Sequence, residues 1–140
     1  MKFKYQEVFL LFFMMAFLLV ACSTPVELEG TWIGYQASRP HRNWTLTIDR
    51  DQFELVCEDP HMWYRGNLKL NNNCDRHKMD LIIGATAAQI NKGTASFGIY
   101  EIEADTLVLV VSEPGNSQRP SSFDQTQASV AFVFERFKQD

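Results

Sequence analysis

The fold is decided by the stretch WTLTIDRDQFELVC, residues 44–57, in which apolar and polar side chains alternate on both sides of a short polar link. The apolar side chains occupy positions 44, 46 and 48 before the link and positions 53, 55 and 57 after it. A period of two gives each segment one apolar face, as in a half-buried strand. The link Arg50-Asp51 is too short for a parallel crossover, so the two strands pair antiparallel.

The same period of two extends over most of the chain from Glu29 onward, and no apolar stripe of helical period accompanies it. We expect eight strands, at Gly30 to Ala37, Trp44 to Asp49, Gln52 to Glu58, Tyr64 to Leu70, Lys78 to Ile83, Ser96 to Glu103, Thr106 to Glu113 and Ala128 to Lys138. A second short link, Ala104-Asp105, again requires antiparallel neighbours. Eight such strands in about 110 residues favour a closed up-and-down barrel or a compact sandwich, and a barrel leaves no unpaired edge.

Two connections are longer than a tight turn. Residues 84–93 contain alanines that permit a short helix, which Gly93 would end. Residues 114–127 are rich in proline, glycine, serine and glutamine, so we expect a loop between the last two strands.

The first 21 residues differ in composition from the rest of the chain. Lys2 and Lys4 precede a 13-residue run, Val8 to Val20, that contains neither a charge nor a proline. A helix needs about 20 apolar residues to span a bilayer core, so this run is too short, and its layout is typical of a secretory signal. We expect residues 1–21 to be a cleaved signal peptide, residues 22–28 a tether and residues 29–138 the barrel domain.

The end of this segment, Leu19-Val20-Ala21-Cys22, resembles the lipobox of bacterial lipoproteins. The resemblance implies export, cleavage after Ala21 and lipidation of Cys22, and several acyl chains anchor a protein stably to a membrane. Ser23, where an aspartate would retain the protein at the inner membrane, resembles the signal for outer-membrane sorting in a host with two membranes. The expected partner of the N-terminus is therefore a membrane.

The first strand opens with Gly30-Thr31-Trp32, the Gly-x-Trp of lipocalin-like barrels. Together with residues 98–107, Pro114-Gly115 and Arg119-Pro120 followed by Phe123, it resembles an uncharacterised lipocalin-like family that is expanded in planctomycete bacteria. The resemblance runs from Glu27 to Lys138. It implies an eight-stranded antiparallel up-and-down lipocalin-like barrel and brings no established activity with it. In such folds the tryptophan packs beneath an arginine of the last strand, which implies that Trp32 and Arg136 close the barrel.

Two features depart from that family. Ala104 stands where the family has a glycine in the turn, and alanine tolerates a positive φ poorly. Val108 and Val110 make their strand apolar on both faces, where the family has a charged residue that points outward. We expect a cover over this outer face, from residues 84–93 or from a partner protein.

The cysteines and histidines invite a metal-binding interpretation, because Cys57, His61, Cys74 and His77 are ligand types that zinc accepts. The predicted strand Tyr64 to Leu70 separates the two pairs by roughly 20 Å at ~3.3 Å per residue. This separation is too large for one metal or for a disulfide. We expect no metal, and we favour free thiols over a Cys57 to Cys74 bridge, which an exported compartment would permit.

No motif of nucleophilic catalysis is present in the sequence. His41, His61 and His77 fall in expected loops without an implied serine or acid partner. Glu101 and Glu103 share one face of a strand, and their alternation with apolar neighbours indicates solvated, outward side chains. The net charge of −4 repels phosphate backbones. We expect no enzyme activity, no cofactor and no nucleic-acid partner.

The interior of an eight-stranded barrel is either filled by side chains or holds one small ligand. Candidate ligand-binding residues on inward positions are Trp32, Gly34, Trp44, Tyr64 and Tyr100. Large residues dominate the inward positions, which favours a filled core and recognition at an open end or on the Val108 and Val110 strip. We therefore expect a non-catalytic interaction or binding module of the cell envelope. The alternative is a carrier or sensor of a small apolar ligand, which needs a cavity of roughly 300 Å³ or more.

Overall fold

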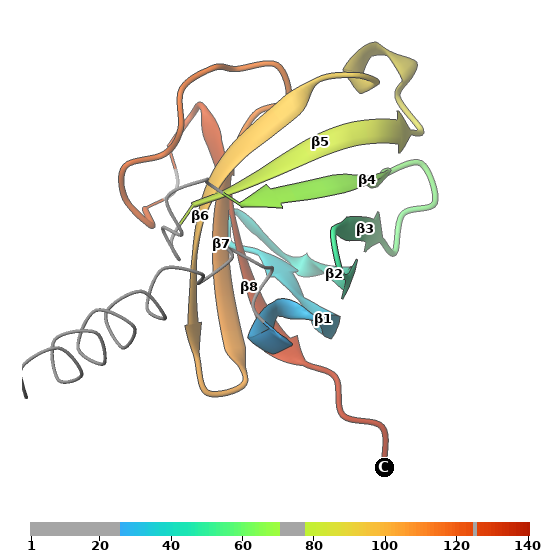
Figure 1. The fold of residues 1–140 in the computed structure, drawn as a ribbon, viewed down its shortest axis with the longest axis vertical. Helices are drawn as coiled ribbons and strands as arrows, with labels where there is room; N and C mark the ends of the chain where they lie inside the picture. Colours follow the sequence, from blue (N-terminus) through green and yellow to red (C-terminus); the bar gives the residue numbers. More distant parts are fainter. Residues whose placement is uncertain (1–25, 71–77, 125) are drawn as a thin grey trace, which may run out of the picture.

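Eight strands form one closed antiparallel barrel in the computed structural model, which describes residues 26–70, 78–124 and 126–140 (Figure 1). The strands are β1 (Gly30–Gln36), β2 (Arg39–Asp49), β3 (Gln52–Cys57), β4 (Trp63–Leu70), β5 (Lys78–Thr86), β6 (Ala95–Glu103), β7 (Thr106–Ser112) and β8 (Ser129–Arg136). Each strand pairs with the next, and β8 pairs with β1. The expected eight-stranded up-and-down barrel is confirmed, and the sandwich is excluded.

Within the described residues, two short 3-10 helices accompany the strands, η2 (Val26–Leu28) ahead of β1 and η3 (Gln89–Asn91) between β5 and β6. The second occurs in the connection where the alanines permit a helix. Within the described ranges, no helix has the length and apolar character needed to cross a bilayer. The signal segment and Cys22 lie outside the described residues.

Two strands extend beyond their predicted bounds by three or more residues. β2 begins at Arg39 rather than at Trp44, and β5 continues beyond Ile83 to Thr86 with a register shift opposite Arg65. The residues added to β2 are mostly exposed, so apolar and polar side chains do not alternate there. Where a strand extends beyond the core, its side chains no longer alternate between apolar and polar, so the sequence does not reveal the extension.

One end of the barrel is filled by apolar side chains and closed by an arginine. Leu28 and Trp32 are fully buried, and the Trp32 Nε1 donates a hydrogen bond to the Leu28 carbonyl oxygen at 3.0 Å. The Arg136 guanidinium lies over the Trp32 ring, with its Cζ 4.1 Å from the ring centroid. It also donates to the carbonyl oxygens of Glu29, at 2.9 Å, and Glu27. The arginine thus ties η2 and β1 to β8, in the pairing that the Gly-x-Trp resemblance implies.

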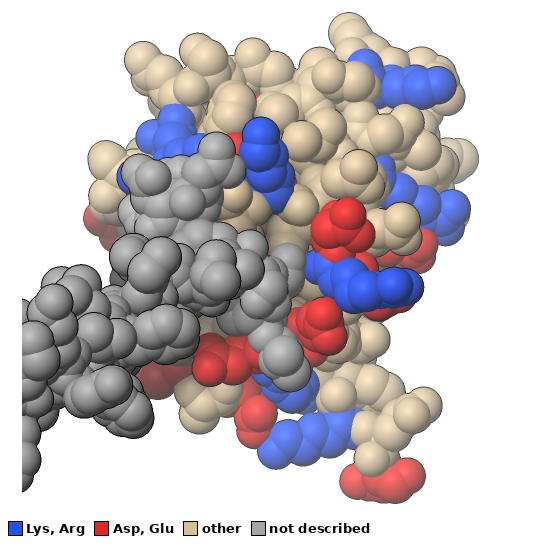
Figure 2. Space-filling view, in the orientation of Figure 1, with Lys and Arg blue, Asp and Glu red and all other residues tan. Residues whose placement is uncertain are grey.

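The same end carries the β6–β7 turn and the end of β8, which lie in the lower part of Figure 1. Asp105 in that turn forms an ion pair with Lys138 at 2.7 Å and lies 3.7 Å from the Arg136 Nε. Figure 2 shows acidic and basic side chains interspersed over the lower half of the visible face. That part of the surface presents no field of a single sign. We call this end, marked by Leu28, Trp32 and Arg136, the closed end.

The outer face of β6, β7 and β8 holds a second small apolar cluster. Val110 is fully buried there with Ile99 and Ala131, which face it across the sheet. Val110 is therefore not an accessible outer strip, as the sequence analysis considered. From the β7–β8 connection, Arg119 reaches this outer side and donates to the Gly98 carbonyl oxygen at 2.7 Å. It also forms an ion pair with Asp80 at 2.7 Å.

The turn between β6 and β7 holds a strained residue. Ala104 has a φ of 53°, in the left-handed region that glycine occupies without cost. We expect Ala104→Gly to raise the free energy of unfolding by about 0.5–1 kcal/mol, measured by chemical denaturation. Ala85→Gly makes the same chemical change within β5, where φ is not positive, and should lower stability by a similar amount. If both substitutions lowered the free energy of unfolding, the conclusion that Ala104 is strained would be wrong.

Arg136 should contribute far more to stability than an exposed cation does. We expect Arg136→Ala to lower the free energy of unfolding by about 2–4 kcal/mol, because it removes a cation–π contact and charge-assisted hydrogen bonds. Arg136→Lys keeps the charge but loses the planar guanidinium, so its free energy of unfolding should lie between those of the wild type and Arg136→Ala. The control is Lys138→Ala, which removes an exposed ion pair and should cost at most about 1 kcal/mol. Equal effects of the two alanine variants would refute the closing role.

Candidate binding pocket at the open end

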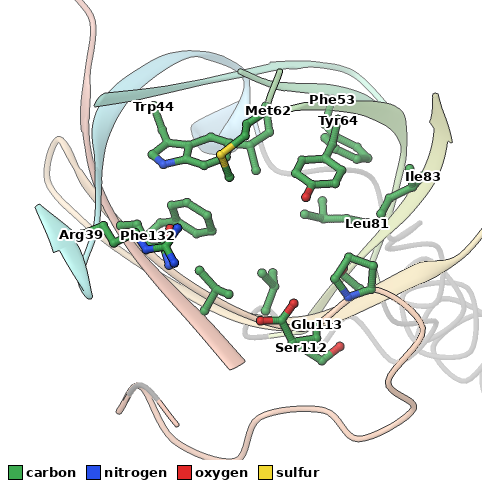
Figure 3. Close-up of a pocket in the computed structure, with 16 residues that line it drawn as sticks. Arg39, Trp44, Phe53, Met62, Tyr64, Leu81, Ile83, Ser112, Glu113 and Phe132 are labelled. Atoms are coloured by element: carbon green, nitrogen blue, oxygen red, sulfur yellow. The ribbon is translucent and has the colours of Figure 1, made fainter. Parts of the chain in front are cut away.

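A pocket of about 200 Å³ opens at the end of the barrel opposite the closed end (Figure 3). All eight strands contribute to it, and the residues that line it within strands are Gln36, Arg39, Trp44, Phe53, Leu55, Tyr64, Leu81, Ile83, Ser96, Val111, Ser112, Val130 and Phe132. Because β-strands hold their side chains more precisely than loops do, the walls of this pocket are preformed.

Aromatic rings form one wall of the pocket. The Trp44 and Phe132 rings meet edge to face, with centroids 5.5 Å apart and planes at 78°. Phe132 stacks on Phe134 below it, with centroids 5.5 Å apart and planes at 12°. Such ring pairs add stability beyond the area that they bury. The wall joins the core continuously, so the pocket ends where the packed interior begins.

A buried donor belongs to this wall. The Trp44 side chain is 2% exposed, and its Nε1 has no hydrogen-bond partner among the described residues. A buried donor without an acceptor costs about 1–3 kcal/mol. The aromatic wall is therefore mainly apolar, but it contains one buried N–H group that lacks a hydrogen-bond acceptor among the described residues.

Polar groups stand at the mouth of the pocket. In Figure 3 the Tyr64 hydroxyl points into the cavity, Glu113 lies across from it beside Ser112, and Arg39 lies beside Phe132 on another side. Burial raises the pKa of the Tyr64 hydroxyl, the nearby Glu113 carboxylate raises it further, and a hydrogen bond with the Asn91 side chain acts in the opposite direction. The hydroxyl therefore remains a neutral donor at physiological pH.

Arg39 and Glu113 are charged groups of opposite sign at the same mouth. Both residues are exposed, and neither forms an ion pair with another residue in the described ranges. Arg39 is the first residue of β2, and Glu113 directly follows β7. The barrel thus offers a cation and an anion above an apolar cavity.

The structure brings together two of the five candidate ligand-binding residues. Trp44 and Tyr64 line the pocket. Trp32 lies at the closed end, and Tyr100 is buried in the core cluster, outside the pocket lining. Gly34 faces the backbone of β8, where an added Cβ would come within 1.9 Å of the Val133 carbonyl oxygen. Its small size allows two strands to approach closely and does not open a cavity.

Arg39 and Glu113 were not identified as site residues from the sequence. Both stand at strand ends, beyond the apolar alternation on which the search for inward positions relied. A signal was nevertheless available, because sequential antiparallel strands place the start of one strand beside the end of its neighbour. Charged residues at alternating strand ends therefore gather at one mouth.

Of the residues considered for metal binding and catalysis, those that the structure describes lie outside the pocket lining. Cys57 is buried and has no disulfide partner among the described residues, and Glu101 and Glu103 are exposed, as their alternation with apolar neighbours predicts. Cys74 and His77 lie outside the described residues. Among the residues that the structure does describe, no cluster of three histidine, cysteine or acidic side chains is placed to hold a metal ion.

Comparison of the chain with protein-family models, with curated proteins and with solved structures gives no match.

The electrostatic coupling at the mouth is directly measurable. We expect Glu113→Gln to lower the pKa of Tyr64, because a neighbouring negative charge is lost, and Asn91→Ala to raise it, because an opposing hydrogen bond is lost. Because folding raises this pKa, stability is expected to fall as the pH rises above about 10. NMR titration of ¹³Cζ-labelled tyrosine reports these pKa values. A Tyr64 pKa that neither substitution moves would show that the three side chains do not meet.

Proposed function

We propose that this protein is an exported, lipid-anchored binding protein of the cell envelope that takes a small ligand into the open end of its barrel. One observation carries the proposal, namely the pocket of about 200 Å³ with mainly aromatic and aliphatic walls and with charged and polar groups at its mouth. This combination is typical of sites that bury the apolar body of a ligand and orient its polar head. The function is non-catalytic, and the anchor is the lipidated Cys22.

The size of the pocket restricts the ligand. Sites for drug-sized molecules have volumes of roughly 300–1,000 Å³. This pocket is smaller, because the interior below it is filled by buried side chains such as Leu46, Leu107 and Leu109. We infer that the ligand is compact and binds near the mouth, which combines the mostly packed core with the carrier or sensor function that the sequence left as the alternative.

A protein partner at the open end is the second candidate function. The observation in its favour is Ile90 in η3, whose side chain is 86% exposed on the β5–β6 connection. Phe123 in the β7–β8 connection is 38% exposed. These loops would contact an envelope protein without involving the cavity, so a variant that fills the cavity distinguishes the two functions.

Filling the pocket should abolish ligand binding without unfolding the barrel. Val130 lines the pocket, whereas Val133 on the same strand points outward. We expect Val130→Phe to remove saturable binding of indole, a compact aromatic probe, and Val133→Phe to retain it. Isothermal titration calorimetry measures the binding, and circular dichroism confirms the fold of both variants. Equal binding of indole by the two variants would contradict a site inside the barrel.

The anchor is tested separately from the pocket. We expect mass spectrometry of the protein from its native host to detect a mature chain that begins at an acylated Cys22. Cys22→Ser should abolish lipidation and release the protein from membranes, because the stable anchor is lost. A mature chain that still begins at Met1 would contradict the anchor and leave the pocket unaffected.

A further inference from the structure

We propose that the ligand of this pocket is a small zwitterion of the α-amino acid type, with an ammonium and a carboxylate at one end of an apolar body. The inference rests on the proposed function, since it specifies the chemistry of the ligand in the same pocket. It is drawn from the arrangement of charge at the mouth relative to the apolar walls below.

The first observation is that both charges stand at the same end of the barrel. Arg39 begins β2, Glu113 follows β7, and both contribute to the pocket mouth. Figure 3 places them on different sides of the cavity, with Arg39 beside Phe132 and Glu113 beside Ser112. A small ligand that reaches both side chains must carry two opposite charges at the end that remains in the mouth.

The second observation is that both charges are available. Within the described parts of the chain, Arg39 and Glu113 form no ion pair with each other or with other residues. A guanidinium presents a planar pair of donors that matches a carboxylate, and a carboxylate accepts hydrogen bonds from an ammonium. Each interaction is charge-assisted and therefore stronger than a neutral hydrogen bond.

The third observation concerns the space below the mouth. Trp44, Phe53 and Phe132 line the deeper cavity, where an apolar side chain would be buried. The Tyr64 ring and its neutral hydroxyl face the same cavity as Glu113. An aromatic face stabilises a nearby ammonium, and the apolar cavity excludes a second charged end. An apolar or aromatic side chain on an α-amino acid meets all of these conditions.

Four matched compounds test the proposal on the full chain in phosphatidylcholine vesicles by isothermal titration calorimetry. L-phenylalanine carries both charges, phenethylamine lacks the carboxylate, 3-phenylpropionate lacks the ammonium, and 2-phenylethanol carries neither. We expect L-phenylalanine to bind about tenfold more tightly than either singly charged compound, because each of those compounds lacks one charge-assisted hydrogen bond that L-phenylalanine forms. The uncharged alcohol should bind most weakly.

Two variants assign the charges to their partners. Arg39→Gln should weaken L-phenylalanine and 3-phenylpropionate by about tenfold and leave phenethylamine unchanged. Glu113→Gln should weaken L-phenylalanine and phenethylamine by about tenfold and leave 3-phenylpropionate unchanged. Lys92→Gln and Glu58→Gln are the matched controls, because both residues are exposed and outside the pocket lining, and neither should change any affinity.

The outcomes separate this inference from the proposed function. If all four compounds bind with equal affinity and Val130→Phe removes them all, the zwitterion is overturned and the pocket function stands. If none of the four binds while indole binding remains sensitive to Val130→Phe, the zwitterion is again overturned alone. If indole also fails to bind, the proposed function is overturned with it.

Discussion

The contact of the Arg136 guanidinium with the Trp32 ring is the interaction on which the rest of the structure depends. A barrel closes only when its last strand pairs with its first, and this pairing sets Arg136 opposite Trp32. The same guanidinium holds the carbonyl groups ahead of β1, so that Leu28 is buried at the end of the barrel. The contacts that close the barrel wall therefore also fill this end of the barrel. The remaining cavity lies at the opposite end.

Stability and recognition are consequently separated along the barrel axis. The closed end contains fully buried side chains whose polar groups find partners, as the Trp32 Nε1 does in the Leu28 carbonyl. Within the described residues, the open end keeps an unfilled cavity, the Trp44 indole N–H has no hydrogen-bond partner, and Arg39 and Glu113 form no ion pair. Polar groups without partners destabilise a fold by a few kcal/mol at most, and a ligand can bind to them.

Much of this architecture could be predicted from the sequence, because the apolar alternation persists wherever a strand faces the core. β3 begins at the predicted Gln52 and ends within one residue of the predicted position, whereas the exposed start of β2 at Arg39 was missed. Trp44 and Tyr64 were identified as inward residues by the same alternation. The role of Gly34 was not predictable in this way, because it depends on how closely β1 and β8 approach, which is a property of the closed barrel. Glu113 was missed because charged residues at strand ends follow no periodic pattern in the sequence.

Indole Nε1 signals in a ¹⁵N NMR spectrum give the most direct test of the central claim that ligands enter the open end. The chain has three tryptophans, with Trp32 at the closed end, Trp44 in the pocket wall and Trp63 outside the pocket lining. Addition of indole should shift the Trp44 signal and leave the signals of Trp32 and Trp63 in place. A shift of Trp32 or Trp63 while Trp44 stays unchanged, or no shift at saturation, would contradict the account.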